Sequence, residues 1–466
     1  MKILLIRPKE TDSMVQREAY PAGALLLLGT MLQNKGHEVK ITHMAAGKLE
    51  LPELKNILVS FKPEIVGITM NTFQTRSARE VSDLVKETSK TALVVTGGPH
   101  PSALKTEIFG HFPNIDVVVV GEGEHTFMEI AEGKDLKDIK GICYAGRENP
   151  ARGFSADLDH IPLPNLDLVD INDFSGSDPV GGYPSMFIMA SRGCPYQCCF
   201  CNKSIWGSKV RFRKPELIVQ EIEWLHNKYG IREIFFQDDT FNLNREWAEK
   251  IFNLIIEKKL NKNIVYKTPF RANEKLVDEK LLRLAKAAGF WLIFYGVENG
   301  NQKMLDSMGK GLTIEEIKRA FKLTHEAGIE TIGSFIIGMP GETEETVNDS
   351  IKLWEEITPY VTGCVTAIPF PNTEFDKIVT KAGHKLISDY SQFSVNKIIV
   401  RTEALDEHKI RSLHTKFRKM ILRRFFLDVL KLRYLRLMLV ALKSPRYGYE
   451  VLYKVRAYFK RLRPSD

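Results

Sequence analysis

Two successive series of alternating strand and helix patterns divide this chain of 466 residues. Short runs rich in β-branched residues alternate with amphipathic stretches, first over residues 1–150 and again over residues 185–371. Strands that alternate with helices pair in parallel, because each connection has to return across the sheet. The pattern therefore predicts an α/β protein with two parallel-sheet domains.

The first series predicts a doubly wound, Rossmann-like domain over residues 1–150. Ligands of such folds bind beyond the carboxyl ends of the strands. Polar or glycine-rich turns follow three of the expected strands there, at Met70-Asn71-Thr72, Gly97-Gly98-Pro99-His100 and Gly121-Glu122-Gly123-Glu124. The strands themselves are expected at Lys2–Arg7, Glu38–Thr42, Glu64–Thr69, Ala92–Thr96 and Asp116–Val120.

The second series predicts a partial (β/α)6 TIM-like barrel over residues 185–385, after a proline- and glycine-rich linker at residues 151–184. The active site of such a barrel lies at the carboxyl ends of its strands. Six strands are expected, at Met186–Ser191, Glu233–Gln237, Val265–Phe270, Trp291–Val297, Thr331–Ile337 and Gly363–Ile368.

The remaining residues, 386–466, are expected to form a basic, mostly helical C-terminal region. From Arg401 onward the chain has 18 Lys and Arg against 6 Asp and Glu, so the net charge of +8 belongs to this region. Arginines interleave with apolar residues, which is typical of a helix on a membrane surface. It is equally typical of a helix that packs on the barrel and keeps its basic side chains in solvent.

Composition sets further expectations about location and partners. No run of about 18 uncharged apolar residues is present, so no transmembrane helix is expected. We expect a cytoplasmic protein, with membrane association through the basic region as an alternative. Because no nucleic-acid-binding motif accompanies the basic charge, no nucleic-acid partner is expected.

Four of the six cysteines lie between residues 194 and 201, on the loop after the first strand of the barrel series. A tight group in a large chain favours metal binding over disulfides. Spacings of three and two residues allow Cys194, Cys198 and Cys201 to converge on one site. Thiolates are the ligands of iron–sulfur clusters, and three of them leave one iron of a [4Fe–4S] cluster open.

A structural zinc site that uses all four cysteines is the rival interpretation. Cys198 and Cys199 are adjacent, so their side chains diverge, and the chain has no second Cys-x₂-Cys knuckle. We therefore expect Cys199 to be a packed thiol that binds no metal. A non-catalytic iron–sulfur or zinc-binding protein stays open as an alternative function.

The motif Cys194-x₃-Cys198-x₂-Cys201, with aromatic Phe200 before its last cysteine, resembles the signature of radical S-adenosylmethionine (SAM) enzymes. The resemblance implies that a [4Fe–4S] cluster on the three cysteines cleaves SAM reductively to a 5′-deoxyadenosyl radical. It also implies an electron donor such as flavodoxin or ferredoxin, and a contact of Phe200 with SAM.

The strand ends of the barrel carry further residues that the resemblance implies for SAM. Asp238 and Asp239 end the second strand, where the family contacts the methionine amino group, often with a Gly-Gly-Glu motif that this chain lacks. Arg271, Glu298 and Phe335 lie at the next three strand ends. The alternatives are a helix N-cap at Asp239 and a solvated rim arginine at Arg271.

The first domain resembles the cobalamin-binding domain of one large radical SAM subclass. The motif Asp-x-His-x-x-Gly, whose histidine ligates cobalt, is absent, which predicts cobalamin without a histidine lower ligand. The alternative is a Rossmann-like domain that binds no corrin. The residues implied for cobalamin are Thr69, Met70, Asn71, Gly97, Gly98, Gly121, Glu122 and Gly123.

These resemblances imply cobalamin-dependent methylation of an unactivated carbon in a small molecule, either a lipid or a secondary metabolite. Radical cyclisation, oxidation or carbon–carbon coupling without methyl transfer is the alternative, as in the tetrapyrrole cyclase-like and lipid-coupling members.

Overall fold

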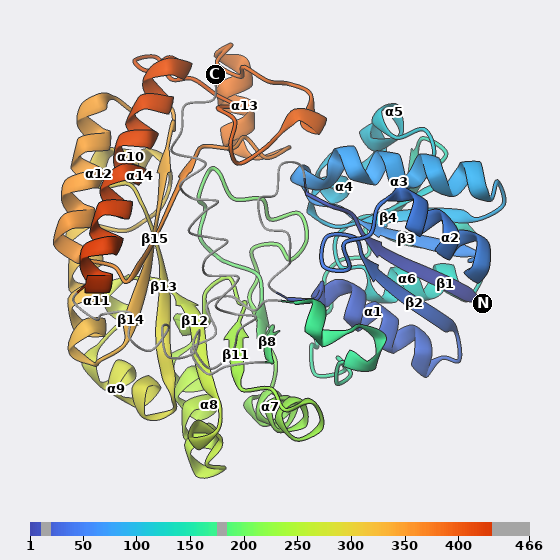
Figure 1. The fold of residues 1–466 in the computed structure, drawn as a ribbon, viewed down its shortest axis with the longest axis horizontal. Coiled ribbons are helices and arrows are strands. Elements are labelled where there is room, and N and C mark those ends of the chain that lie inside the picture. Colours follow the sequence, from blue (N-terminus) through green and yellow to red (C-terminus); the bar gives the residue numbers. More distant parts are fainter. Residues whose placement is uncertain (11–19, 175–183, 431–466) are drawn as a thin grey trace.

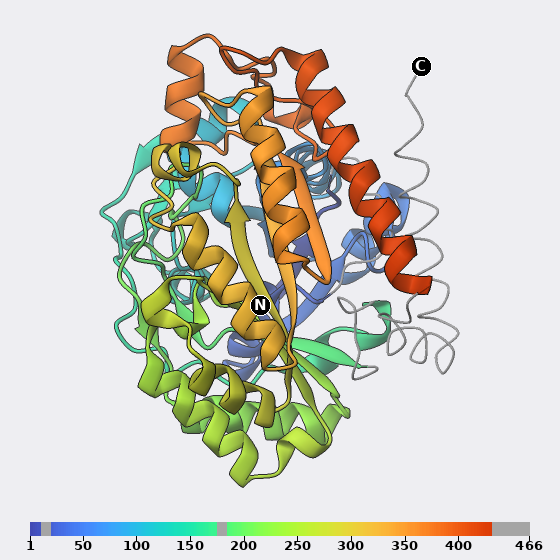
Figure 2. The ribbon, with the colours of Figure 1, turned by 90° about the vertical axis from the view of Figure 1, so that its left-hand side faces the viewer.

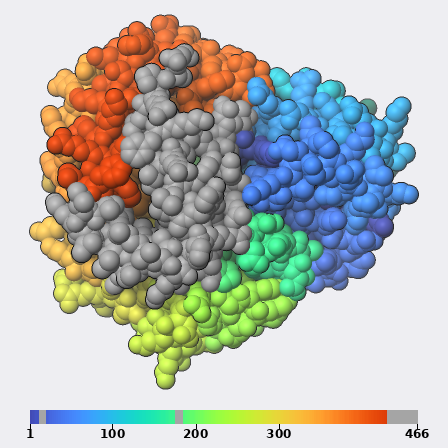
Figure 3. Space-filling view, viewed as in Figure 1, coloured from blue at the N-terminus to red at the C-terminus, as the bar shows by residue number. Residues whose placement is uncertain are grey.

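The computed structural model describes residues 1–10, 20–174 and 184–430. They form an N-terminal α/β domain and an open parallel barrel that lie side by side (Figure 1). The expected fold class is confirmed. In the space-filling view the N-terminal domain (blue) lies directly against the barrel half of the molecule (Figure 3).

The N-terminal sheet has the strand order β2-β1-β3-β4-β5-β6-β7. Its first five strands are parallel, while β6 and β7 add an antiparallel edge that the sequence did not predict. The order reverses between β1 and β3, which is the switch point where such folds bind ligands. The strands are β1 (Lys2–Arg7), β2 (Glu38–His43), β3 (Ile65–Thr69), β4 (Leu93–Gly97), β5 (Val117–Val119), β6 (Ile142–Tyr144) and β7 (Arg147–Glu148).

Helices cover both faces of this sheet because successive strand residues point to opposite sides. Ile3 and Leu5 of β1 pack with α1 (Gly23–Asn34) and α6 (Glu124–Ala131). Leu4 and Ile6 pack on the other face, with the helices α2 (Leu51–Phe61) and α3 (Thr75–Thr88). The short helices α4 (Pro99–Leu104) and α5 (Ile108–His111) follow β4.

The barrel sheet has six parallel strands in the order β15-β14-β13-β12-β11-β8, so neighbours in the sheet are neighbours in sequence. Its strands are β8 (Ser185–Ile188), β11 (Glu233–Phe236), β12 (Val265–Phe270), β13 (Phe290–Glu298), β14 (Glu330–Ile337) and β15 (Val361–Thr366). Figure 2 shows helices along its outer face. These include α7 (Pro215–Tyr229), α8 (Arg245–Glu257), α9 (Glu279–Ala287), α10 (Gln302–Ser307), α11 (Ile314–Glu326) and α12 (Glu344–Ile357).

Helix α14 (Glu407–Leu430) belongs to this outer layer. Ile410, Leu413 and Phe417 are buried in the main barrel core. The described part of the basic region is thus a helix packed on the barrel, one of the two interpretations left open by the sequence. No helix in the described part of the chain combines the length and apolarity needed for a bilayer span.

Residues between the barrel and α14 differ from the mostly helical expectation. After α13 (Glu374–Lys381), the chain from residue 386 to 405 is irregular apart from one short turn of 3₁₀ helix at Tyr390–Gln392. This segment rests on the N-terminal domain, where the Thr75 hydroxyl donates to the Tyr390 carbonyl at 3.0 Å. The contact joins the two halves of the molecule at a point far in sequence from the linker at residues 151–184.

An aromatic cluster under the barrel sheet gives a first prediction. Phe290 is fully buried, with ring centroids 4.8 Å from Phe252 and 5.2 Å from Tyr266. Replacing Phe290 by Ala should lower the free energy of unfolding by about 3–5 kcal/mol, through lost burial and the cavity left behind. Urea unfolding followed by circular dichroism measures this value.

The matched control is Phe426→Ala, because the Phe426 side chain is 39% exposed. Its effect should stay within about 0.5 kcal/mol. Equal losses from the two substitutions would contradict the assignment of Phe290 to the core.

Candidate active site

A cavity of about 470 Å³ lies between the two domains. The carboxyl ends of β3, β4 and β5 line one side, and β8 with the cysteine loop lines the other. The ligand-binding ends of the N-terminal sheet and of the first two barrel strands, β8 and β11, thus share this space. The residues that bring the two halves together here include Thr69, Gly97, Gly98, Gly121, Gly123, Met189, Cys194, Cys201, Lys203, Trp206 and Asp239.

The cysteine loop is residues 193–210, which begin and end at a short antiparallel pair, β9 (Ser191–Arg192) and β10 (Arg211–Phe212). Gly193 opens the loop with a φ of +94°, and a Cβ there would lie 2.5 Å from the Lys209 carbonyl oxygen. Only glycine fits this close, left-handed turn. The loop then folds back on itself, since the Cys201 amide donates to the Cys198 carbonyl at 3.1 Å.

Two of the three predicted ligands line the cavity, and the third, Cys198, is near enough to Cys201 for its charge to act on that thiol. Cys194 and Cys201 line the cavity. Although Cys201 is exposed as a residue, protein atoms desolvate its thiol, and this, with the charges of Asp239, Cys198 and Cys194, raises its pKa to about 11. A bound cation would favour the charged form of such thiolates. The donor set is therefore suited to a cluster.

A single metal ion does not fit the same cysteines. Tetrahedral zinc, with bonds of about 2.3 Å to sulfur, requires sulfurs within about 3.8 Å of one another. Within residues 1–10, 20–174 and 184–430, no three His, Cys, Asp or Glu side chains lie close enough to hold one ion. An iron–sulfur cluster distributes its thiolates over separate irons, so it does not require the sulfurs to meet at one atom.

Cys199 points away from this group. Its amide donates to the Met308 carbonyl at 2.9 Å, and its carbonyl accepts from the Phe375 amide at 3.0 Å. Its side chain, and that of the neighbouring Phe200, pack into a separate apolar cluster with Met308 and Phe375. The structure thus places Phe200 in this cluster and not in the lining of the cavity.

The two carboxylates that end β11 have different surroundings. Asp238 is buried and accepts hydrogen bonds from the Ser191 amide and hydroxyl, the latter at 2.5 Å. Burial raises the pKa of Asp238 to about 7 in spite of these donors. Asp239 instead lines the cavity, and burial raises its pKa while a bond from the Gly193 amide opposes the shift. Only Asp239 of this pair faces the shared space.

Arg271 contacts the cysteine loop at the aromatic ring of Tyr196. Its guanidinium carbon lies 3.4 Å from the centroid of Tyr196, which sits between the first two cysteines. Its Nε donates to Asn273 Oδ1 at 2.6 Å. The arginine is buried, so it is not a solvated rim residue. This stacking holds a cation beside the loop.

The other two strand-end candidates are occupied by protein contacts. Glu298 is buried with a φ of +66° and pairs with Lys310 Nζ at 2.8 Å. Phe335 is fully buried, and its ring centroid lies 5.3 Å from that of Phe417 on α14. The side chain of Phe335 thus packs under the sheet and not at the cavity.

Six of the eight residues implied for cobalamin line the cavity, at the carboxyl ends of β3, β4 and β5: Thr69, Gly97, Gly98, Gly121, Glu122 and Gly123. A Cβ on Gly98, whose φ is +113°, would lie 2.7 Å from the Met70 carbonyl oxygen. Met70 is itself buried in the core, and Asn71 caps a 3₁₀ turn by accepting from the Phe73 amide at 2.9 Å. These last two side chains are used structurally.

The sequence missed part of the cavity wall. Phe127 of α6 and Trp206 of the cysteine loop also line it. The start of α1 lines it too, from its first residue Gly23, and here the sequence Pro21-Ala22-Gly23 already resembled the helix opening of cobalamin-binding domains. Trp206 lies in the irregular cysteine loop, so no periodic pattern could reveal it.

The two histidines nearest the first domain's strand ends are neutral structural groups. His43 Nε2 accepts from the Ala22 amide at 2.8 Å, and His100 Nδ1 lies 3.2 Å from the Thr72 hydroxyl. Burial lowers the pKa of each to about 3. No histidine in the described ranges lines the cavity.

Comparisons with known proteins agree with this architecture. A family model of the Radical SAM superfamily matches residues 188–353, and one of the B12 binding domain matches residues 15–131. An uncharacterized methyltransferase of Pyrococcus horikoshii is 32% identical over 428 residues, which cover 89% of this chain and 91% of that protein. The chain therefore belongs to the radical SAM enzymes that carry an N-terminal B12 binding domain.

Other similar proteins differ in reaction. The anaerobic magnesium-protoporphyrin IX monomethyl ester cyclase of Rubrivivax gelatinosus is 26% identical, over 92% of this chain and 79% of its own length. The radical SAM methyltransferase TsrM from Kitasatospora setae has a TM-score of 0.68 at 20% identity, covering 83% of this chain and 76% of that one. The cobalamin-dependent enzyme OxsB has a TM-score of 0.72 at 16% identity, covering 98% and 72%. These last two likenesses concern the fold.

The raised pKa of Asp238 predicts a pH dependence of stability. The folded protein keeps a proton on Asp238 up to about pH 7, whereas the unfolded chain loses it near the ordinary value of 3.8. Between these values the unfolded state binds fewer protons, so stability falls as pH rises and levels off above about 7. Asp238→Asn removes this contribution.

Urea unfolding of both proteins at about pH 5 and about pH 8 measures the difference. Wild type should lose more stability than Asp238→Asn over this interval. Parallel changes in the two proteins would rule out Asp238 as the titrating group.

Proposed function

We propose that Cys194, Cys198 and Cys201 bind a [4Fe–4S] cluster in the inter-domain cavity and that SAM is cleaved there. The observation that carries this is the glycine-opened loop, which presents Cys194 and Cys201 to the cavity and turns Cys199 into a separate core. When bound, such a cluster supplies one electron to the sulfonium group of SAM, which yields methionine and a 5′-deoxyadenosyl radical.

The chain's own residues orient SAM in this proposal. Asp239 faces the cavity and accepts from the methionine ammonium group. Arg271, held flat on Tyr196, binds the methionine carboxylate with its guanidinium. Asp238 is a positioning residue in this proposal and does not contact SAM. Its bonds to Ser191 tie the end of β11 to the start of the cysteine loop.

The N-terminal side of the cavity fits a corrin. Gly97, Gly98, Gly121 and Gly123 leave the backbone open to a flat, bulky ligand. The cavity also extends between the sheet and its α1/α6 layer, where its wall is apolar: Leu5, Leu25, Leu28, Gly67, Val95, Val119 and Phe127. Such a slot suits the apolar face of a nucleotide base. We propose that this domain binds cobalamin without a histidine lower ligand.

Methylation of an unactivated carbon in a small molecule is the reaction we propose. It is supported by the 32% identical methyltransferase and by the placement of the corrin side and the thiol side on one cavity. We propose a lipid or a secondary metabolite as the substrate. Radical cyclisation is the second candidate, because the cyclase relative matches 92% of this chain.

Three further parts of the proposal concern partners and location. A one-electron protein such as flavodoxin or ferredoxin reduces the cluster. Exposed Phe426 and Leu427, beside exposed Arg423, support contact of α14 with a membrane surface. Six free cysteines suit the reducing cytoplasm.

The adjacent cysteines offer a matched test of the cluster. Cys198→Ala should abolish 5′-deoxyadenosine formation after anaerobic reconstitution, because a cluster ligand is lost. Cys199→Ala should retain at least about half of the activity, because Cys199 packs in a small apolar site. Chromatography of 5′-deoxyadenosine under dithionite is the measurement. Full activity of Cys198→Ala would refute the assignment.

The methylation proposal has its own readout. Methyl transfer from SAM produces S-adenosylhomocysteine in step with 5′-deoxyadenosine when substrate is converted, whereas cyclisation produces only the latter. Mass spectrometry of both products with cobalamin-loaded enzyme and candidate lipids separates the two reactions. Turnover without S-adenosylhomocysteine would favour the cyclase alternative.

A further inference from the structure

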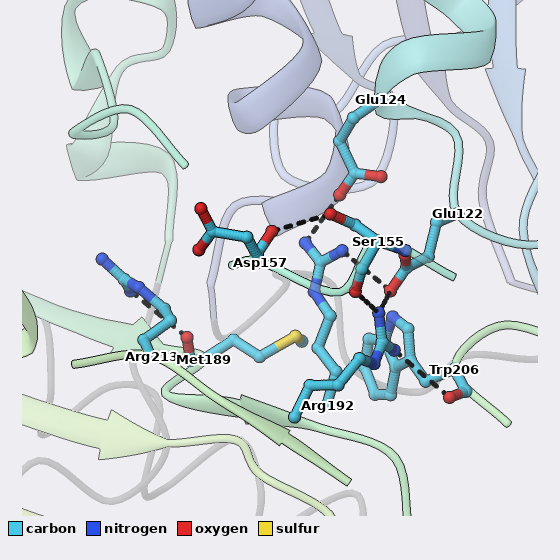
Figure 4. A network of polar contacts seen from close by, with 9 residues as sticks. Glu122, Glu124, Ser155, Asp157, Met189, Arg192, Trp206 and Arg213 are labelled. Atoms are coloured by element: carbon cyan, nitrogen blue, oxygen red, sulfur yellow. Dashed lines mark hydrogen bonds and ion pairs between the residues drawn. The ribbon is translucent and has the colours of Figure 1, made fainter. Parts of the chain in front are cut away.

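Glu122 lies where the N-terminal domain meets the cysteine loop, and arginines from the barrel surround it. Its Oε1 accepts from Arg192 Nη1 at 3.2 Å and from Arg211 Nη1 at 2.7 Å. Its Oε2 accepts from the Ser155 amide at 2.8 Å. Arg192 also donates to Glu124 at 2.6 Å. Figure 4 shows the Arg192 side chain directed at both carboxylates.

The two arginines are the two ends of the cysteine loop. Arg192 immediately precedes residues 193–210 and Arg211 immediately follows them, and the two residues are paired partners in the β9–β10 ladder. One carboxylate of the N-terminal domain thus holds both ends of the loop that carries the proposed cluster ligands. The loop's other anchors, such as the Cys199 amide on the Met308 carbonyl, come from the barrel, whereas Glu122 ties both ends of the loop to the N-terminal domain.

Burial makes this arrangement stiff. The side chains of Arg192, Arg211 and Glu122 are 8%, 5% and 6% exposed, and that of Glu124 is 14% exposed. Charge-assisted hydrogen bonds that are shielded from solvent in this way are short and directional. The charges balance, since two guanidinium groups meet two carboxylates, so the network has no free charge to offer a ligand.

Glu122 and its two neighbours also line the cavity on the proposed corrin side. Gly121 and Gly123 flank it and line the cavity, as do Cys194 and Cys201 of the loop that it holds. The sequence resemblance implied that Glu122 contacts cobalamin. The structure shows both of its carboxylate oxygens engaged by protein donors.

We propose that Glu122, with Arg192 and Arg211, is a positioning device that sets the separation between the corrin and the cluster. This inference rests on the proposed function, since it assumes that both groups are bound. Methyl transfer requires that the corrin, SAM and the substrate are correctly positioned relative to one another. Reductive cleavage of SAM requires only the cluster and the loop that holds it. Loosening the device should therefore impair the first process more than the second.

The test variant is Glu122→Gln, which keeps the shape of the side chain and removes its charge. Both proteins are loaded anaerobically with cobalamin and cluster, and the two groups are quantified by absorbance. We expect unchanged occupancy and a ratio of S-adenosylhomocysteine to 5′-deoxyadenosine that falls roughly 10- to 100-fold, as expected for a displacement of about 1 Å.

A spectroscopic readout separates positioning from mere activity loss. The relaxation of the electron paramagnetic resonance signal of bound Co(II) cobalamin depends on its distance from the reduced cluster. In Glu122→Gln the mean relaxation rate should differ from that of wild type, and the distribution of rates should be broader. The matched control is Glu129→Gln: Glu129 lies on helix α6, which begins two residues after Glu122, and it pairs with Arg152 and Lys134, outside the cysteine loop. It should leave both the relaxation and the product ratio unchanged.

Two outcomes would overturn the inference. One is a Glu122→Gln protein with wild-type relaxation and product ratio. The other is loss of cobalamin with the cluster retained, which would make Glu122 a corrin contact. Should Glu122→Gln fail to fold, Arg211→Lys, which keeps the charge but loses the fork, takes its place with the same expectations.

Failure of the proposed function is distinguishable from failure of this inference. If wild type binds no cobalamin, the proposed function fails. Hydrogen exchange of the unloaded proteins then still tests the device. Glu122→Gln should speed exchange in residues 193–212 and 120–126, and Glu129→Gln should not. Equal exchange in the two variants would overturn the device itself.

Discussion

One cavity is shared by the carboxyl ends of the N-terminal sheet and of the first two barrel strands, and this arrangement governs the other contacts of the site. Parallel strands joined by crossovers put their ligand-binding loops on one edge. Here two such edges face each other, so loops distant in sequence share a space of about 470 Å³. The buried contacts of Glu122 and the segment around Tyr390 hold this arrangement from two places.

Rigid placement matters because radical chemistry leaves little tolerance for misalignment. A reactive intermediate must meet its substrate before solvent, and closing the site with protein provides both proximity and exclusion of water. The cysteine loop illustrates how this is achieved locally: Gly193 makes the entry turn, the Cys199 amide anchors to Met308, and the two flanking arginines bind the other domain. The contacts that fix the position of the loop thus matter for function as much as its thiols do.

Much of the fold could be predicted because it follows from local patterns. The strands of both sheets were expected within a few residues, and burial explains why: alternate residues of β1 enter two different cores. The edge strands β6 and β7 were missed, since they are only three and two residues long. The irregular path from residue 386 to 405 was missed because its contacts are with residues distant in sequence: Tyr390 contacts the N-terminal domain, and Phe393 and Leu405 pack in the barrel half.

For the candidate site, the donor types and their order could be read from the sequence: three spaced cysteines, glycine turns after strands, and polar residues at barrel strand ends. These depend on local chemistry and on chain direction. Which side chains share the cavity depends instead on how the two domains pack. Asp239 faces it while its neighbour Asp238 is buried against Ser191, and Phe335 turns to Phe417. The arginines that pair with Glu122 lie 70 residues or more away in the sequence. The physical reason is that side-chain partners across a domain interface depend on packing geometry, which no local spacing encodes.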